Sequence, residues 1–170
     1  MKSHLYFVCP TDHLEPIIDK ESEQKNFFYS SLGNTMVFNN YFASELAELL
    51  FNRSIDSITF ILSDNNQIFL DALYRQDYPE IKGMKSFYED ITDQKEQLRN
   101  MDIEVVDSEI HILKRYLKLK VERLQNCLVD LGFDHLKIDA SIFDESNRRF
   151  NKIKLNPDYN NADLAGHKRS

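Results

Sequence analysis

The sequence of 170 residues has little of the material on which several kinds of functional site depend. It contains only four glycines, and none belongs to a G-x-G or G-x-x-x-x-G-K pattern, so a glycine-rich phosphate loop is excluded. It also lacks a G-x-S-x-G nucleophile motif and a Cys-x-x-Cys pair. The two cysteines, Cys9 and Cys127, could pair in principle. We expect two free thiols, because a chain of this size can build its core without a disulfide in a reducing compartment.

Long apolar runs and clusters of positive charge are missing as well. No run approaches the roughly 18 apolar residues of a membrane helix, and the N-terminal run LYFVC is too short for a signal peptide, which predicts a cytoplasmic protein. The formal net charge is −7, and no stripe of Lys and Arg with interleaved aromatic residues offsets it. We therefore expect neither nucleic acid nor a membrane as a partner.

What the sequence does contain is an ordinary globular composition, with 42% apolar and 29% charged residues. Its length suits one domain. We expect a single α/β domain over residues 1–155. Residues 156–170 offer almost no apolar side chains for a core and are expected to form a flexible tail.

Short apolar or alternating runs, bounded by turn residues, predict the strands. They lie at residues 4–9, 26–29, 57–63, 103–106, 135–143 and 148–155. The last two flank the turn sequence DESN and are expected to form a C-terminal β-hairpin.

Helices are expected at four places: within residues 14–26, from an N-cap at Ser44 to Phe51, over residues 66–76, and from Ser108 to Gly132. The last is the clearest, because its apolar residues recur in steps of three and four until a glycine that can end a helix. Residues 77–100 are charged without a clear period and are expected to form a surface loop with a short helix. The alternation of strands and helices predicts a mainly parallel central sheet flanked by helices.

Three polar loops follow the first three strands: CPTDH (9–13), SSLGN (30–34) and SDNN (63–66). Ligands of open parallel sheets bind where loops leave the carboxyl ends of the strands, so these loops form the candidate ligand pocket. Its candidate residues are Cys9, Asp12, His13, Gly33, Asn34, Ser63, Asp64 and Asn66. The Gly33-Asn34 turn could also present backbone N–H groups to a small anion.

In order and spacing these loops resemble those of the β-class carbonic anhydrases. That family has a Cys-x-Asp-x-Arg loop, an Asn-Ala-Gly-Asn turn and a His-x-x-Cys loop after successive strands, where this chain has VCPTDHLEP, SSLGNTM and FILSDNN. The C-terminal helix and hairpin also look similar, with SIFD (141–144) near the end. The resemblance covers roughly residues 4–154, and it implies the family's α/β fold and a homodimer or higher homo-oligomer.

The resemblance also implies that most of the family's zinc site is lost. The Cys, His and Cys ligands correspond to Cys9, Ser63 and Asn66, and the family's Asp-Arg pair corresponds to Thr11 and His13. Hydroxyl and amide oxygens are poor replacements for imidazole and thiolate, so no zinc cofactor and no carbon dioxide hydration are expected. A shift of one residue would align Asp12 with the family's Asp, but the Arg would still be absent.

Three hypotheses about function remain. The first is a non-catalytic member of this fold that binds a small ligand or a partner, or that serves as an oligomeric scaffold. The second is a metal-dependent lyase or hydratase with a site rebuilt from Cys9, Asp12, His13 and Asp64. The plainer interpretation of those residues is that Asp12 and Asp64 cap turns while His13 faces solvent. The third is an unrelated α/β interaction domain.

Overall fold

A computed structural model describes residues 2–101 and 108–155 of the chain. The strand expected at 103–106 and the tail expected at 156–170 lie outside the described residues. Among the described helices, none is both long and apolar enough to cross a membrane.

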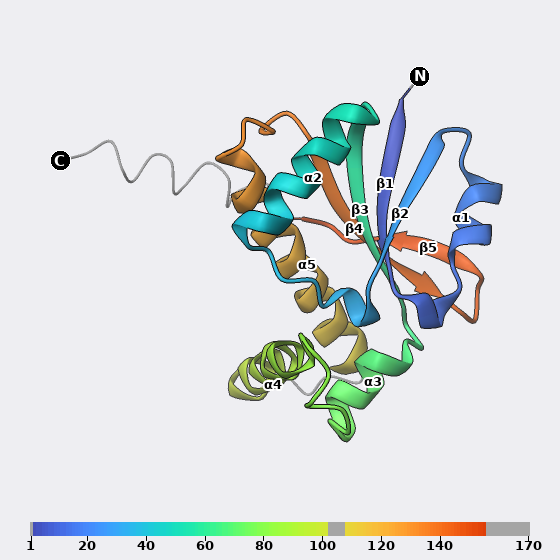
Figure 1. The fold of residues 1–170 in the computed structure, drawn as a ribbon. Coiled ribbons are helices and arrows are strands. Elements are labelled where there is room, and N and C mark those ends of the chain that lie inside the picture. Colours follow the sequence, from blue (N-terminus) through green and yellow to red (C-terminus); the bar gives the residue numbers. More distant parts are fainter. Residues whose placement is uncertain (1, 102–107, 156–170) are drawn as a thin grey trace.

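The strands form one sheet, and all but the last run in parallel. They are β1 (Ser3–Val8), β2 (Lys25–Ser30), β3 (Ile55–Ser63), β4 (Lys137–Asp144) and β5 (Arg149–Lys152). Their order across the sheet is β2-β1-β3-β4-β5, and β5 returns antiparallel to β4 as a hairpin. The predicted fold class, a mainly parallel α/β sheet with a C-terminal hairpin, is confirmed (Figure 1).

In the part of the chain that the structure describes, five α-helices surround this sheet: α1 (Glu15–Glu21), α2 (Asn40–Asn52), α3 (Gln67–Tyr74), α4 (Met84–Asn100) and α5 (Ser108–Val129). Figure 1 shows α2 and α5 on one face of the sheet and α1 on the other, with α3 and α4 beyond the ends of the central strands. The larger core cluster joins the first face to α2 through α5, and a smaller one lies under α1 around Val8 and Ile61. The expected helices within 14–26 and 66–76 are confirmed as α1 and α3.

The prediction for residues 77–100 is wrong. Residues 84–100 form the 17-residue helix α4, which buries Met84, Phe87, Tyr88 and Ile91. These four residues occupy positions i, i+3, i+4 and i+7 and lie on one face, so the helix has a genuine apolar stripe. The many charged residues between them hid that stripe in the sequence.

The prediction that Ser44 caps α2 is also wrong. The helix begins at Asn40, and the side chain of Asn39 accepts a hydrogen bond from the backbone N–H of Phe42 at 2.9 Å. Asparagine is as good an N-cap as serine, and the chain has one a full turn earlier. The earlier start buries Phe42 and Ala43 against the sheet.

Helix α5 follows the predicted apolar periodicity. It ends at Val129, three residues before Gly132, whose φ of +80° lies in the left-handed region that glycine tolerates. Leu113, Leu117 and Leu124 on its stripe are at most 1% exposed. The helix thus fixes one face of the sheet and carries side chains toward the carboxyl ends of the strands.

Candidate functional site

The three predicted loops lie together at the carboxyl ends of β1, β2 and β3. The first contains the 3-10 helix η1 (Pro10–Asp12), the second contains η2 (Leu32–Asn34), and the third is the turn between β3 and α3. The backbone N–H of Gly33 donates to the sulfur of Cys9 at 3.2 Å, which joins the first two loops. The backbone N–H of Ser63 donates to the Asp12 carboxylate at 2.9 Å, which joins the first and third.

Cys9 is fully buried between these loops. Besides the bond from Gly33, its sulfur lies 3.1 Å from the hydroxyl oxygen of Thr11. Cys127 is half-buried, and both cysteines are free, as the sequence predicts. The Cys9 sulfur is therefore a hydrogen-bonded part of the core.

Asp12, and not Thr11, faces the third loop. One carboxylate oxygen accepts from the Ser63 N–H, and the other accepts from the side-chain amide of Asn66 at 2.8 Å. Burial raises the pKa of Asp12 above its ordinary value of 3.8, and these two hydrogen bonds oppose that shift. The carboxylate is thus held by two donors at a largely desolvated position.

Asn66 is fully buried and uses both ends of its amide. Its nitrogen donates to Asp12, and its oxygen accepts from the backbone N–H of Phe69 at 2.8 Å, which caps the first turn of α3. Rotating the amide to turn its oxygen elsewhere would break the cap and leave the Asp12 carboxylate unpaired. Asn66 is therefore a structural link between the first loop and α3.

The remaining residues of the third loop contact Glu145, which the sequence analysis did not single out. The Ser63 hydroxyl donates to a Glu145 carboxylate oxygen at 3.3 Å, and the Glu145 backbone N–H donates to Asp64 at 3.2 Å. Glu145 directly follows β4 and so lies at the same edge of the sheet as the three loops. That position was the available signal, but the sequence DESN favoured the simpler interpretation of a hairpin turn.

The second loop needs its glycine. Gly33 has a φ of +57°, and a Cβ there would lie 3.1 Å from Ile68 and 3.2 Å from Phe87. The fully buried hydroxyl of Tyr116 on α5 donates to the carbonyl oxygens of Gly33 at 2.8 Å and Asn34 at 3.1 Å. Tyr116 is a second residue that the sequence analysis missed, because it looks like one more member of an apolar stripe.

Asn34 is also fully buried, and its amide nitrogen donates to the Ile61 carbonyl at 3.2 Å. The backbone N–H of Asn34 donates to the Ser31 carbonyl, and that of Gly33 donates to Cys9. A small anion at this turn would have to compete with these internal bonds. Anion binding there stays a prediction.

The residues of the hypothetical rebuilt site do not assemble around one point. His13 has a left-handed φ of 52° and an exposed side chain, while Asp12 and Asp64 hold backbone N–H groups of other loops. Across residues 2–101 and 108–155, no group of three or more His, Cys, Asp or Glu side chains is placed to hold a metal ion. The structure therefore gives the rebuilt-metal hypothesis no support.

The three positions that the resemblance assigns to zinc ligands do not fit that ion. Cys9 offers one sulfur, which already accepts a hydrogen bond, and Ser63 and Asn66 offer a neutral hydroxyl and amide engaged in the contacts above. Structural and catalytic zinc sites take thiolate, imidazole and carboxylate ligands. The donor set at these positions supplies at most one of them.

No family model matches the sequence, and no curated protein matches it either. Solved structures of β-carbonic anhydrases do match this chain. CafD of Aspergillus fumigatus superposes with a TM-score of 0.70 at 17% identity over 91% of this chain and 90% of its own. The Coccomyxa enzyme in complex with acetazolamide gives 0.71 at 12% identity over 98% and 84%. One of two tetrameric enzymes from Sordaria macrospora gives 0.69 at 12% identity over 89% and 80%.

Identities this low establish the fold alone. The matches extend over most of both chains, so the likeness covers the whole described domain and not one supersecondary motif. The polypeptide between β1 and β5 has the fold of the β-carbonic anhydrases.

Proposed function

We propose that this protein is a non-catalytic relative of the β-carbonic anhydrases, which acts by binding a small ligand or a partner, or as an oligomeric scaffold. One observation carries the proposal: Asn66 stands where the resemblance places a zinc-binding cysteine, and both ends of its amide are committed to Asp12 and to α3. A metal-bound hydroxide is the nucleophile that zinc hydratases need. A chain without the ligands for zinc has no means to generate it.

The contacts of Cys9 and Ser63 support the same proposal. The sulfur of Cys9 accepts from Gly33, and the hydroxyl of Ser63 is shared between Glu145 and the backbone N–H of Asn65. The loops are therefore stabilised by direct contacts that replace a metal as the link between them. A fold whose loops are joined in this way does not require zinc for stability.

We also propose a homodimer or higher homo-oligomer in the cytoplasm. The similar enzymes of Sordaria macrospora are described as tetrameric. Strand β2 lies at the edge of the sheet, and its Phe27, Phe28 and Tyr29 are only partly buried. An edge strand with partly exposed aromatic residues is suited to pairing with a second copy. Sedimentation at equilibrium measures the mass, and a monomer at high concentration would contradict this part.

The test of the lost zinc site is elemental mass spectrometry of protein purified without tag or chelator, together with stopped-flow assays of carbon dioxide hydration. We expect less than about 0.1 equivalent of zinc and no hydration above the buffer rate. Near one equivalent of zinc with hydration activity would overturn the proposal.

A double variant with Ser63→His and Asn66→Cys provides the matched comparison. It restores the imidazole and thiolate that the resemblance assigns to these positions, beside the native Cys9. Zinc uptake by the double variant but not by the wild type would locate the loss at these two residues. Equal zinc content in the two proteins, with circular dichroism showing that the double variant is folded, would show that the correspondence of positions is wrong.

A further inference from the structure

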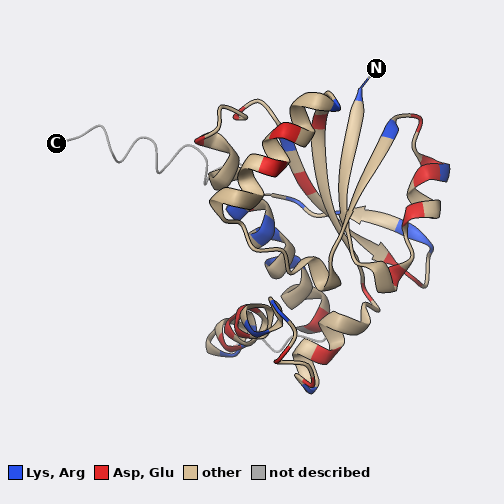
Figure 2. Cartoon of the chain, viewed as in Figure 1, with Lys and Arg blue, Asp and Glu red and all other residues tan. Residues whose placement is uncertain are grey.

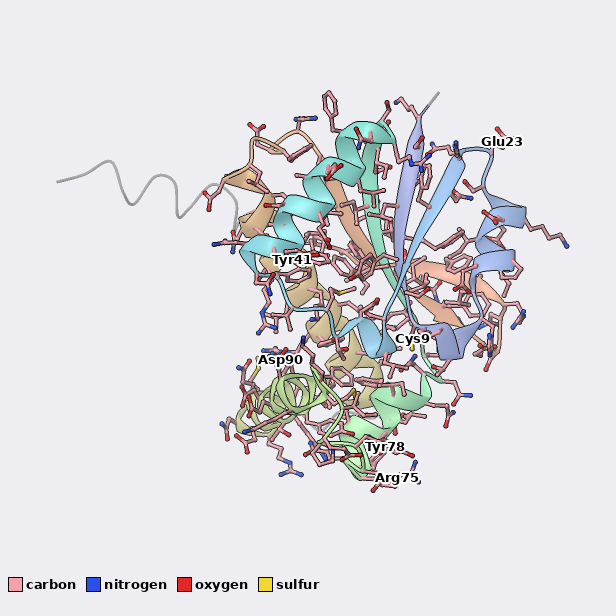
Figure 3. All side chains as sticks on the ribbon, viewed as in Figure 1. Cys9, Glu23, Tyr41, Arg75, Tyr78 and Asp90 are labelled. Carbon is pink, nitrogen blue, oxygen red and sulfur yellow. The ribbon has the colours of Figure 1, made fainter. Side chains whose placement is uncertain are left out.

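A cavity of about 650 Å³ is lined by none of the candidate residues of the three loops described above. Its wall consists of residues 35–39, the first turns of α2, the first half of α4 and the C-terminal half of α5. In Figure 3 the labelled Tyr41 and Asp90 mark α2 and α4 on either side of this region. The volume is within the range of small-molecule sites. We call it the Lys120 cavity.

Lys120 on α5 is the unusual residue of this wall. Lys120 is only 4% exposed. Its ammonium nitrogen lies 5.3 Å from the ring centre of Phe38 and 5.5 Å from that of Tyr116. Within the described residues, its ammonium donates a single long hydrogen bond, of 3.4 Å, to the Met36 carbonyl oxygen. Burial lowers the pKa of Lys120 to about 8, so the side chain is still mostly charged at pH 7.

The other charges of the cavity are already paired or solvated. Arg123 donates two parallel hydrogen bonds, of 2.7 and 2.8 Å, to the two carboxylate oxygens of Asp90 on α4. Asp130, which follows the last residue of α5, is exposed to water. Among the described residues, no carboxylate forms an ion pair with Lys120. The cavity therefore contains one buried positive charge in need of a counter-ion.

The surroundings of Lys120 also favour an anion over other guests. Helix α2 begins at Asn40 in the same wall, and the N-terminus of a helix carries a partial positive charge. Figure 2 shows basic residues along α5 and acidic residues on α2, and the acidic residues of α2, Glu45 and Glu48, are exposed to water. Phe38, Phe87 and Ala43 give the cavity an apolar side, and Asn126 and Ser86 give it hydrogen-bonding groups.

We propose that the Lys120 cavity binds a small organic monocarboxylate, whose carboxylate pairs with Lys120 and whose apolar part lies against Phe38 and Phe87. A single negative charge matches the single unpaired ammonium. A second one would be repelled by Asp90 and Asp130 in the same wall. This site is separate from the loops around Cys9, so it does not depend on whether those loops hold zinc.

The probe that tests the site is benzoate, titrated into isotopically labelled protein and followed through backbone amide shifts. Ligand efficiency limits how tightly a molecule with so few heavy atoms can bind, and we expect a dissociation constant of about 10 mM or somewhat tighter. The shifts should map to the segments that line the cavity, residues 35–44, 86–90 and 116–131. Benzamide has nearly the same shape without the charge and should bind at least about tenfold more weakly, because hydrogen bonds to charged groups are the stronger ones.

Lys120→Met is the decisive variant, since methionine keeps most of the buried stem and removes the ammonium. We expect affinity for benzoate to fall by about tenfold or more, with thermal stability equal to or above that of the wild type, because a buried unpaired charge is lost. The matched control is Lys95→Met. Lys95 also donates to a carbonyl, that of Leu73 at 2.8 Å, and lies over the ring of Tyr74, but it is outside the cavity wall. Its loss should leave benzoate binding unchanged.

A measurement on the wild type covers the case in which Lys120→Met does not fold. Benzoate should bind the charged form of Lys120, so affinity should fall as the pH rises through about 8. The other charged or ionisable side chains around Lys120 are Asp90, Tyr116, Arg123, Cys127 and Asp130. The pKa values of Tyr116 and Cys127 are raised, so these two groups titrate at higher pH than Lys120. Equal binding of benzamide, full binding by Lys120→Met, shifts elsewhere in the protein, or no binding by 10 mM would each overturn the proposal.

Discussion

The side-chain amide of Asn66 donates a 2.8 Å hydrogen bond to the carboxylate of Asp12, and so ties the loop after β1 to the start of α3. The two residues are 54 positions apart in sequence, and each makes a second bond to a backbone N–H. A carboxylate and an amide held in this way rigidify a group of loops through hydrogen bonds that water cannot easily replace.

Replacing Asn66 with alanine should remove the cap of α3 and leave the buried Asp12 carboxylate with one donor fewer. We expect a loss of about 2–4 kcal/mol in the free energy of unfolding, which combines a lost N-cap with an unsatisfied buried acceptor. Urea denaturation measures it. The neighbouring Asn65 is exposed, so Asn65→Ala should change stability far less. Equal effects of the two substitutions would contradict the structural role of Asn66.

The raised pKa of Asp12 predicts a pH dependence with a definite sign. Burial makes the folded protein hold the proton more tightly than the unfolded chain, so the contribution of Asp12 to stability falls as the pH rises from its ordinary pKa of 3.8 through the folded value. Asp12→Asn lacks this titration. Its unfolding free energy, minus that of the wild type, should therefore increase with pH over this window. A difference that stays flat, or that decreases, would show that Asp12 is not desolvated.

The sequence predicted the strands and the loops that follow them better than the contacts that join distant residues at the site. Regular apolar runs such as LYFV and SITFILS predicted β1 and β3 with their polar carboxyl ends, because alternation and turn residues are local properties. The roles of Glu145 and Tyr116 depend on strands and helices that are brought together from more than 80 residues away. No local pattern encodes such a contact.

Helix α4 shows a different kind of failure. Met84, Phe87, Tyr88 and Ile91 have the spacing of a helix stripe, so the signal was present. Beyond Ile91 only the partly buried Leu98 continues the apolar stripe, and the charged residues of the second half of the helix diluted the signal. The missed cap at Asn39 has a similar origin, since Asn and Ser are nearly equivalent caps and only the buried Phe42 decides between them.

A pair of glycine substitutions should separate steric crowding from backbone strain. Both Gly33 and Gly132 have a positive φ, but a Cβ would meet Ile68 and Phe87 at Gly33 and nothing within 4 Å at Gly132. Gly132→Ala should cost about 1 kcal/mol in the unfolding free energy from φ alone. Gly33→Ala should cost about 1–3 kcal/mol more, because tight packing resists the extra methyl group. Similar losses of unfolding free energy at both sites would mean that the core around Gly33 rearranges easily to accept the methyl group.

The hydroxyl of Tyr116 offers the sharpest test of the link between α5 and the second loop. Tyr116→Phe keeps the buried ring against Phe87 and removes only the donor to the carbonyls of Gly33 and Asn34. Two buried acceptors would lose a partner, at a cost of about 1–3 kcal/mol in the unfolding free energy. Hydrogen exchange of the Gly33 and Asn34 amides should accelerate, because the loop opens more readily without its anchor on α5. Tyr41→Phe is the control, since Tyr41 is 72% exposed and should change neither quantity. If hydrogen exchange of the Gly33 amide is unchanged in Tyr116→Phe, the turn is held without Tyr116, through the hydrogen bond from the Gly33 N–H to the Cys9 sulfur.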